Sequence, residues 1–344
     1  MVDQRRGTLY AVAAYGLWGL LPLYLVLLRP AGAIEILAHR VVWSFVLLIG
    51  VLIVLRRWHW LRSAGRQPGV LLGLTAAALL IGNNWGFYIY GVSTERVVEV
   101  SLGYFINPLI SVLLGVVCLR ERLRGWQWAA VGMGTVAVIV LSLDYGRPPW
   151  LALVLAVSFA GYGLIKKLVG APALEGMTIE TGVLFIPAVA FLVWAETNGS
   201  TIFGRPVSGL GGSAHAVFAN PAAGGTLLTS VLLVGCGVVT AVPLLLFAGA
   251  ANRVPLTVLG ICQYIAPTLQ LLIGVLVLGE PMPPARLAGF GLVWAALLIF
   301  TVDAVRHTRG RRLLAERDIA TVAGAAGEPC LHDLADHTPV PRHV

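Results

Sequence analysis

The segment SLGYFINPLISVLLGVVCLRER, residues 101–122, has the length and composition of a membrane-spanning helix that ends in a basic turn. A helix needs about 20 apolar residues to cross a bilayer. Asn107 and Pro108 interrupt the apolar run near its middle, and Glu99 lies just before it. Hydrocarbon offers no partners to the hydrogen-bonding groups that such residues leave unpaired. The segment therefore predicts a transmembrane helix whose polar groups face the protein interior or a cavity and not the lipid.

The whole chain has the composition of an integral membrane protein. Of its 344 residues, 58% are hydrophobic and 12% are charged, and the mean hydropathy is +0.86. Soluble domains contain roughly 25% charged residues. Apolar runs of bilayer length predict an all-α integral membrane fold with ten transmembrane helices. The predicted spans are residues 8–28, 34–55, 70–91, 98–119, 126–144, 149–167, 177–195, 226–249, 256–279 and 286–305.

Two stretches fall outside these spans. Residues 196–225 are rich in Gly, Ser and Ala, which predicts a flexible outer loop. Residues 306–344 are polar and predict a disordered cytoplasmic tail. The four cysteines have no CxxC spacing, so neither a metal site nor a cofactor is predicted.

Basic residues are distributed unevenly between the two sides of this predicted topology. Seventeen of the 24 Lys and Arg residues fall on the side that holds both chain ends. Five fall on the opposite side, namely Arg29, Arg96, Arg147, Arg205 and Arg286. Cytoplasmic loops carry the excess of positive charge in membrane proteins, so both termini are predicted to be cytoplasmic. The net charge of +8 is then a topology signal, and no nucleic-acid partner is predicted.

The two halves of the chain resemble each other. A shift of 159 residues pairs Pro108 with Pro267, Gly115 with Gly274, Glu121 with Glu280 and Asp144 with Asp303. Five helices per half is an odd number, so the second half must enter the membrane in the opposite orientation. The turn RERLRG at 120–125 is strongly basic, whereas its counterpart GEPMPPAR at 279–286 holds one Arg. The predicted domains are two inverted repeats, residues 8–144 and 149–305, followed by the tail.

Polar side chains occur inside the predicted spans of both halves. Each ionised group near the bilayer centre costs about 2.5–3.5 kcal/mol on insertion scales, so such groups indicate a substrate path. Pro108 and Pro267 would each free a carbonyl four residues earlier, which favours ligand binding or bending. The candidate path residues are Glu35, His39, Arg40, Asn83, Asn84, Trp85, Tyr88, Glu99, Tyr104, Asn107, Pro108, Tyr162, Glu180, Gln263, Tyr264 and Pro267.

Structural roles are the alternative for several of these residues. Glu99 lies close to a helix start and would then only reach the membrane interface. Glu35, His39 and Arg40 would neutralise one another near the outer surface. Aromatic candidates such as Trp85 would belong to the packing or to the interfacial belt, and the two prolines would only kink their helices.

Five segments carry a family resemblance, namely EILAHRVVWSF (35–45), EVSLGYFINPL (99–109), GYGLIKKL (161–168), VTAVPLLLFAGAANR (239–253) and GICQYIAPTLQ (260–270). They closely resemble the RarD proteins, which belong to the EamA branch of the drug/metabolite transporter superfamily. The resemblance implies ten helices in two inverted EamA repeats, located in a bacterial inner membrane. It also implies secondary transport of a small metabolite or drug-like solute, and a link to chloramphenicol sensitivity. It supplies no list of site residues.

The leading functional prediction is therefore a transporter that works by alternating access, and not an enzyme. The sequence contains no GxxxxGK[ST] motif for ATP hydrolysis. Protons are a candidate coupling ion, through Glu35, His39 or Glu180. A membrane receptor and an intramembrane lipid-modifying enzyme are the alternatives, although HExxH, DDxxD and GxSxG are absent. The predicted partners are a small solute and the lipid bilayer, and a homodimer is left open.

Overall fold

The computed structural model describes residues 2–29, 31–56, 67–120, 123, 125–204, 225–251, 253–254, 258–259, 262–303 and 306. The chain divides into two compact units, Met1–Phe300 and Thr301–Val344. The first unit contains the fold, and every element in its described part is helical. The predicted tail, apart from residue 306, and most of the predicted 196–225 loop lie outside the described residues.

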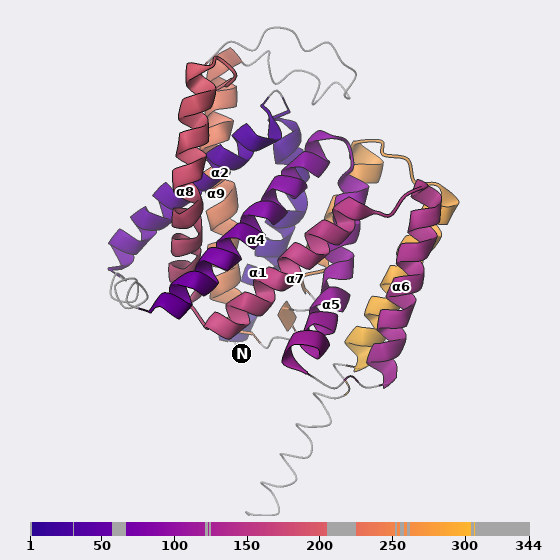
Figure 1. The fold of residues 1–344 in the computed structure, drawn as a ribbon. Helices are drawn as coiled ribbons and strands as arrows, with labels where there is room; N and C mark the ends of the chain where they lie inside the picture. The colour runs from indigo at the N-terminus through magenta and orange to yellow at the C-terminus, as the bar shows by residue number, and fades with distance from the viewer. Residues whose placement is uncertain are drawn as a thin grey trace, which may run out of the picture. The chain divides into compact units, whose positions relative to one another are not determined.

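The helices follow one another along the chain as the apolar runs predict (Figure 1). The first half contains α1 (Val2–Val26), α2 (Ala33–Leu55), α4 (Pro68–Ser93), α5 (Val97–Leu119) and α6 (Gly125–Tyr145). The second half contains α7 (Trp150–Val169), α8 (Ala173–Thr197), α9 (Gly225–Ala251), α11 (Ile265–Leu272), the π-helix η2 (Ile273–Val277) and a helix at Pro284–Asp303.

Nine helices in the described part of the chain are long and apolar enough to cross a membrane. The all-α integral membrane fold is thus confirmed. The predicted span at 256–279 differs, because it contains the eight-residue α11 and the five-residue η2 instead of one long described helix. Pro267 is the third residue of α11. Proline costs little in the first turn of a helix, because the backbone N–H that it lacks would have no partner within the helix there. Pro108, by contrast, lies inside the continuous helix α5.

The helices of the two halves interleave. α7 packs against α4 and α5, α1 packs against α9 and α11, and α2 packs against both α8 and α9. Helix α6 and helix Pro284–Asp303 pack against each other at one edge (Figure 1), where Leu141 meets Gly289. The interior formed in this way consists mainly of Leu, Ile, Val, Ala and Phe.

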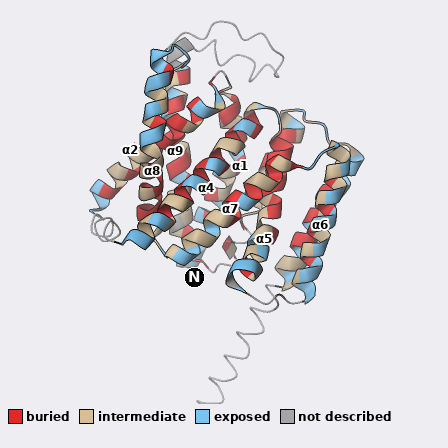
Figure 2. Ribbon diagram, in the orientation of Figure 1, coloured by how far each residue is buried: buried red, intermediate tan, exposed pale blue. Residues whose placement is uncertain are grey.

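The outer surface of the bundle is also apolar. Figure 2 shows exposed residues along much of the length of α6 and α8. Val54, Leu143 and Ile186 are 80%, 78% and 75% exposed and lie on three different helices. Soluble monomers rarely expose large contiguous apolar patches. A surface of this kind suits contact with lipid chains on several sides of the bundle.

Helices α2 and α9 approach each other closely at Gly237. A Cβ atom on this residue would lie 2.6 Å from the carbonyl carbon of Trp43 and 2.7 Å from its oxygen. The obstacle is backbone, which cannot rotate away as a side chain can. Small residues at such crossings allow the close approach on which helix association in membranes depends.

We predict that Gly237→Ala destabilises the protein by about 1–3 kcal/mol, because an added methyl group overpacks the α2–α9 contact. The melting temperature in detergent measures this effect. Gly50→Ala on α2 is the matched control, because nothing lies within 4 Å of its Cβ position. It should leave stability unchanged or raise it by about 0.5–1 kcal/mol. Equal effects of the two changes would contradict the close contact.

Candidate functional site

The bundle has two ends, defined by the connections between its helices. The Glu99 end holds the connections α1–α2, α4–α5 and α6–α7, and the Lys166 end holds α2–α4, α5–α6 and α7–α8. In Figure 1 the Glu99 end is uppermost. Polar side chains gather at each end and also in the interior between them.

Arg40 of α2 is the buried cation of the interior. It is 5% exposed, and its Nε donates a hydrogen bond to Oγ1 of Thr240 on α9, at 2.9 Å. Its guanidinium carbon lies 4.4 Å from the ring centroid of Trp85 on α4. Nη1 is buried without a hydrogen-bond partner, and no carboxylate of the described residues forms an ion pair with Arg40. The predicted neutralisation of Arg40 by Glu35 and His39 is therefore not what the structure shows.

Asn84 connects three helices beside this arginine. Its Nδ2 donates to the Leu155 carbonyl at 2.9 Å and to Oγ of Ser158 at 3.0 Å, both on α7. The hydroxyl of Tyr104 on α5 donates to Oδ1 of Asn84 at 3.1 Å. The side-chain amide is thereby fixed in one orientation. Asn84 itself is 1% exposed.

Tyr88 joins these two groups. Its ring makes an edge contact with Tyr104, with centroids 5.8 Å apart, and Arg40 interacts electrostatically with both tyrosines. The Tyr88 hydroxyl is buried without a partner. We refer to these residues as the central polar cluster, and its members are Arg40, Asn84, Trp85, Tyr88, Tyr104, Ser158 and Thr240.

Two amide side chains in the interior also have an unpaired oxygen. Asn107 lies three residues after Tyr104 on α5, and residues at this spacing share a helix face. Its Oδ1 is buried without a partner. Gln270 of α11 donates from Nε2 to the Trp18 carbonyl at 3.2 Å, while its Oε1 is unpaired. Buried polar atoms are nearly always hydrogen-bonded, so unpaired ones indicate positions where a ligand or water would bind.

Glu35 and His39 lie near the Glu99 end and contact the segment after α8. Oε1 of Glu35 accepts hydrogen bonds from the Thr201 hydroxyl at 2.5 Å and from the Ile202 and Phe203 amides at 2.9 and 3.3 Å. The ring of His39 stacks on Phe203, with centroids 4.8 Å apart. His39 Nδ1 accepts from Trp43, and its Nε2 is unpaired. These contacts fix the chain that follows α8 against α2.

Glu180 of α8 is a buried acid toward the Lys166 end. The Lys166 ammonium donates to its Oε1 at 2.7 Å, and the Tyr162 hydroxyl donates to its Oε2 at 3.1 Å. The carboxylate is fully buried, while the Lys166 side chain is 19% exposed. Lys166 is one of the basic residues on the side predicted to be cytoplasmic, and the structure gives it a buried acidic partner.

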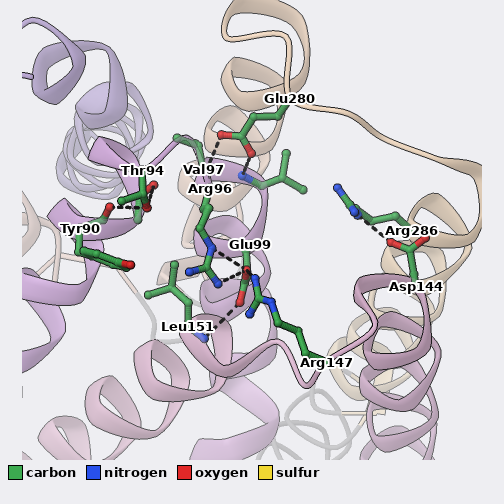
Figure 3. Close-up of polar contacts among 12 residues, drawn as sticks. Tyr90, Thr94, Arg96, Val97, Glu99, Asp144, Arg147, Leu151, Glu280 and Arg286 are labelled. Atoms are coloured by element: carbon green, nitrogen blue, oxygen red, sulfur yellow. Dashed lines mark hydrogen bonds and ion pairs between the residues drawn. The ribbon is translucent and has the colours of Figure 1, made fainter.

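Glu99 is the centre of the corresponding network at the other end (Figure 3). Its Oε2 lies 2.6 Å from Nη2 of Arg96 and 3.3 Å from Nη2 of Arg147. Its Oε1 accepts the Leu151 backbone N–H at 3.2 Å. Glu99 is 2% exposed, so its carboxylate is enclosed by protein groups. It ties the start of α5 to the α6–α7 turn.

Glu280 reaches the same helix start from the second half of the chain (Figure 3). Its two carboxylate oxygens accept the backbone N–H groups of Val97 and Val98, at 2.5 and 2.8 Å. These groups are among the first donors of α5, which have no partner within the helix. Burial raises the pKa of Glu280 above its ordinary value, and the two backbone hydrogen bonds oppose that shift. Nearby, Arg286 pairs with Asp144 at 3.0 Å.

The remaining predicted residues lie apart from these clusters. Asn83 is exposed, because it is one residue away from Asn84 and points to another side of α4. Gln263 and Tyr264 are half-buried just before α11. Pro108 and Pro267 are buried. Within the described residues, no group of three or more His, Cys, Asp and Glu side chains could hold a metal ion.

Several residues that take part in these polar contacts were not among the predicted site residues. Ser158 and Thr240 are small hydroxyl residues in apolar runs, which gave no strong signal. Gln270 follows Pro267 in the segment GICQYIAPTLQ and was detectable only as a polar residue within a span. Glu280 had one sequence signal, its pairing with Glu121 in the internal repeat.

We predict that Glu280→Gln lowers the stability of the protein by about 0.5–2 kcal/mol, as loss of a helix cap does. A glutamine offers one acceptor oxygen in place of two, so one N–H of α5 is left unpaired. The melting temperature in detergent measures the loss. Glu95→Gln is the control, since that side chain is 71% exposed and forms an ion pair with Arg29. No difference between the two variants would argue against the capping role.

Comparison with known proteins identifies relatives of this chain. The model of the EamA-like transporter family matches residues 5–143. A protein named RarD from Streptomyces exfoliatus is 51% identical over 329 residues, which cover 95% of this chain and 98% of the relative. An uncharacterized transporter of Bacillus subtilis is 42% identical over 90% of this chain and 98% of its own length.

A solved crystal structure shares the fold. It matches with a TM-score of 0.52 at 18% sequence identity, over 86% of this chain and 97% of that chain. The family match, the identity to curated relatives along almost the whole length and the apolar helices agree with one another. The chain is a multi-pass membrane protein that belongs to the EamA-like transporter family, among its RarD members.

Proposed function

We propose that this protein is a secondary transporter that moves a small metabolite or drug-like solute across the bacterial inner membrane by alternating access. The observation that carries this proposal is the central polar cluster. Five helices from both halves, α2, α4, α5, α7 and α9, each contribute at least one of its residues. A receptor or scaffold has no need for buried, unpaired polar atoms inside such a bundle. A lipid-modifying enzyme would need a metal or nucleophile motif, which the sequence lacks.

Two inverted repeats, residues 8–144 and 149–305, form part of the proposal. The packing supports them, because the contacts of α1 and α7 correspond. If α1 is the counterpart of α7, then α9 and α11 are the counterparts of α4 and α5. α1 packs against α9 and α11, and α7 packs against α4 and α5. A two-fold axis in the membrane plane generates this reciprocal pattern.

The polar clusters at the two ends are candidate gates. At the Glu99 end, Glu99 and Glu280 connect α5 to the α6–α7 turn and to the segment after η2. At the Lys166 end, Glu180 of α8 connects to Lys166 and Tyr162 of α7. Opening either end would separate charged partners that now compensate each other. Glu180 is also a candidate for proton coupling, together with His39 and Glu35, because a proton can replace an ionic partner.

The distribution of charge supports cytoplasmic termini. At the Glu99 end, each described arginine of the loops has a carboxylate partner. The pairs are Arg29 with Glu95, Arg96 and Arg147 with Glu99, and Arg286 with Asp144. Arg56, Arg120, Lys166 and Lys167 lie toward the Lys166 end. The excess of positive charge at that end makes it the proposed cytoplasmic side.

The orientation of the repeats is testable by labelling. We predict that Gly125→Cys and Ala285→Cys, each in a cysteine-free background, react with a membrane-impermeant maleimide from opposite faces. The Gly125 site should be cytoplasmic and the Ala285 site external, because an inverted repeat places equivalent turns on opposite sides. Both positions are exposed. Labelling of both cysteines from the same face would exclude the inverted arrangement.

Transport itself is testable in proteoliposomes. A metabolite comparison between cells that lack and cells that overproduce the protein supplies the labelled solute, and chloramphenicol is tested in parallel. We predict that Asn107→Leu reduces uptake up to about tenfold, because one hydrogen bond to the solute is worth roughly 0.5–1.5 kcal/mol. Asn83→Leu is the matched control and should transport normally, since this side chain is exposed. Purified protein that moves no solute identified in this way would contradict the proposal.

A further inference from the structure

The buried charges of this protein are compensated unequally. Glu35, Glu99 and Glu180 are each 5% exposed or less, and each accepts hydrogen bonds from N–H, O–H or cationic groups. Arg40 is equally buried but has no acidic partner among the described residues. An arginine cannot lose its proton in a protein. Within the part of the chain that the structure describes, the central polar cluster therefore carries one positive charge without a counter-ion.

The groups around Arg40 compensate this charge only in part. The Thr240 hydroxyl accepts the Nε hydrogen, and the Trp85 ring offers its negative face at 4.4 Å. Both are neutral, so they reduce the cost of burial without cancelling the charge. Breaking a buried ion pair is strongly unfavourable because a lone charge remains. Forming an ion pair with Arg40 should accordingly be favourable. The arginine is already buried, so an anion that binds beside it compensates a charge that now has no partner.

Two donors of the central polar cluster are buried without a hydrogen-bond partner. The first is Nη1 of Arg40, and the second is the Tyr88 hydroxyl. Trp85 and Tyr88 are three residues apart on α4, so they share a helix face, and Arg40 stacks over that face at Trp85. Arg40 and Tyr88 also interact electrostatically. An oxyanion accepts hydrogen bonds from both types of donor and supplies the missing negative charge.

On the basis that the chain is a transporter, we propose that its solute is a small anion whose carboxylate or phosphate group binds Arg40 Nη1 and the Tyr88 hydroxyl. Charge-assisted hydrogen bonds to arginine are about twice as strong as neutral ones. A neutral solute or a water molecule would satisfy the donors but would leave the charge uncompensated. The anion alone satisfies both requirements.

Binding is measured as thermal stabilisation of the full chain in detergent. The probes are acetate, benzoate and phenyl phosphate, with acetamide, benzamide and phenol as their neutral counterparts. At least one anion should raise the melting temperature by about 2–4 °C at a roughly tenfold excess over its Kd. The neutral counterparts should have no such effect. Carboxylate and phosphate probes are compared separately, so the preferred headgroup is identified in the same experiment.

The assignment to Arg40 is tested by variants. Arg40→Gln should abolish the shift caused by anions, Arg40→Lys should retain part of it, and Tyr88→Phe should reduce it while preserving the ring. Arg29→Gln is the control, since Arg29 pairs with Glu95 at the surface, and should respond like the unmodified protein. If Arg40→Gln does not fold, Tyr88→Phe and Arg40→Lys still test the site.

Three results would overturn the proposal: no shift with any of the three anions, equal shifts with an anion and its neutral counterpart, or an unchanged shift in Arg40→Gln. These results are separate from transport. A protein that carries a neutral solute in liposomes and binds none of the anions remains a transporter with another solute class. A protein that binds anions through Arg40 but moves nothing has the anion site without the proposed function.

Discussion

Hydrocarbon cannot accept or donate a hydrogen bond, and this constraint explains most of the polar contacts in the structure. Every polar group brought into the bundle must find a partner in the protein or remain unpaired at a cost. Glu35 satisfies backbone amides after α8, Asn84 bridges α5 and α7, and Glu280 satisfies the first amides of α5. In each case a polar side chain joins parts of the chain that are distant in sequence.

Because of the same constraint, buried polar groups that remain unpaired indicate positions where a ligand or water would bind. Arg40, Tyr88, Asn107 and Gln270 each keep a buried polar atom without a hydrogen-bond partner, although the buried residues of the bundle are mainly apolar. These residues come from α2, α4, α5 and α11, so the unpaired atoms are contributed by both halves. The close contact at Gly237 holds α2, which carries Arg40, against α9. A transporter needs this combination, because the solute must replace the missing partners for only part of the transport cycle.

The two ends of the bundle differ from the interior in holding ion pairs between charged side chains. Ion pairs at Glu99 and Glu180 connect neighbouring helices at opposite ends. A solute path through the centre would thus be bounded by two polar closures, with an uncompensated cation between them. Under the proposed alternating access, the two closures would open in turn, and ion pairs that can exchange partners with water suit this role better than apolar contacts.

The sequence by itself determined the membrane class, the number of apolar segments and the family. Bilayer thickness sets the length of an apolar run, so the spans could be predicted from local composition alone. The sequence could also predict which spans contain polar residues, including Arg40, Asn84 and Glu180. It could not predict that Glu35 and Arg40, five residues apart, have different partners, or that Asn83 is exposed while Asn84 is buried.

Only the tertiary structure decided those points, because partners depend on which helices pack together. Glu280 contacts Val97 and Val98 across more than half of the chain, and Arg40 contacts Thr240 over a similar separation. No local pattern encodes such pairs. The sequence also did not predict that α11 begins at Ile265. Hydropathy shows that residues 256–279 are apolar enough for one span, but it does not show where within them a helix begins.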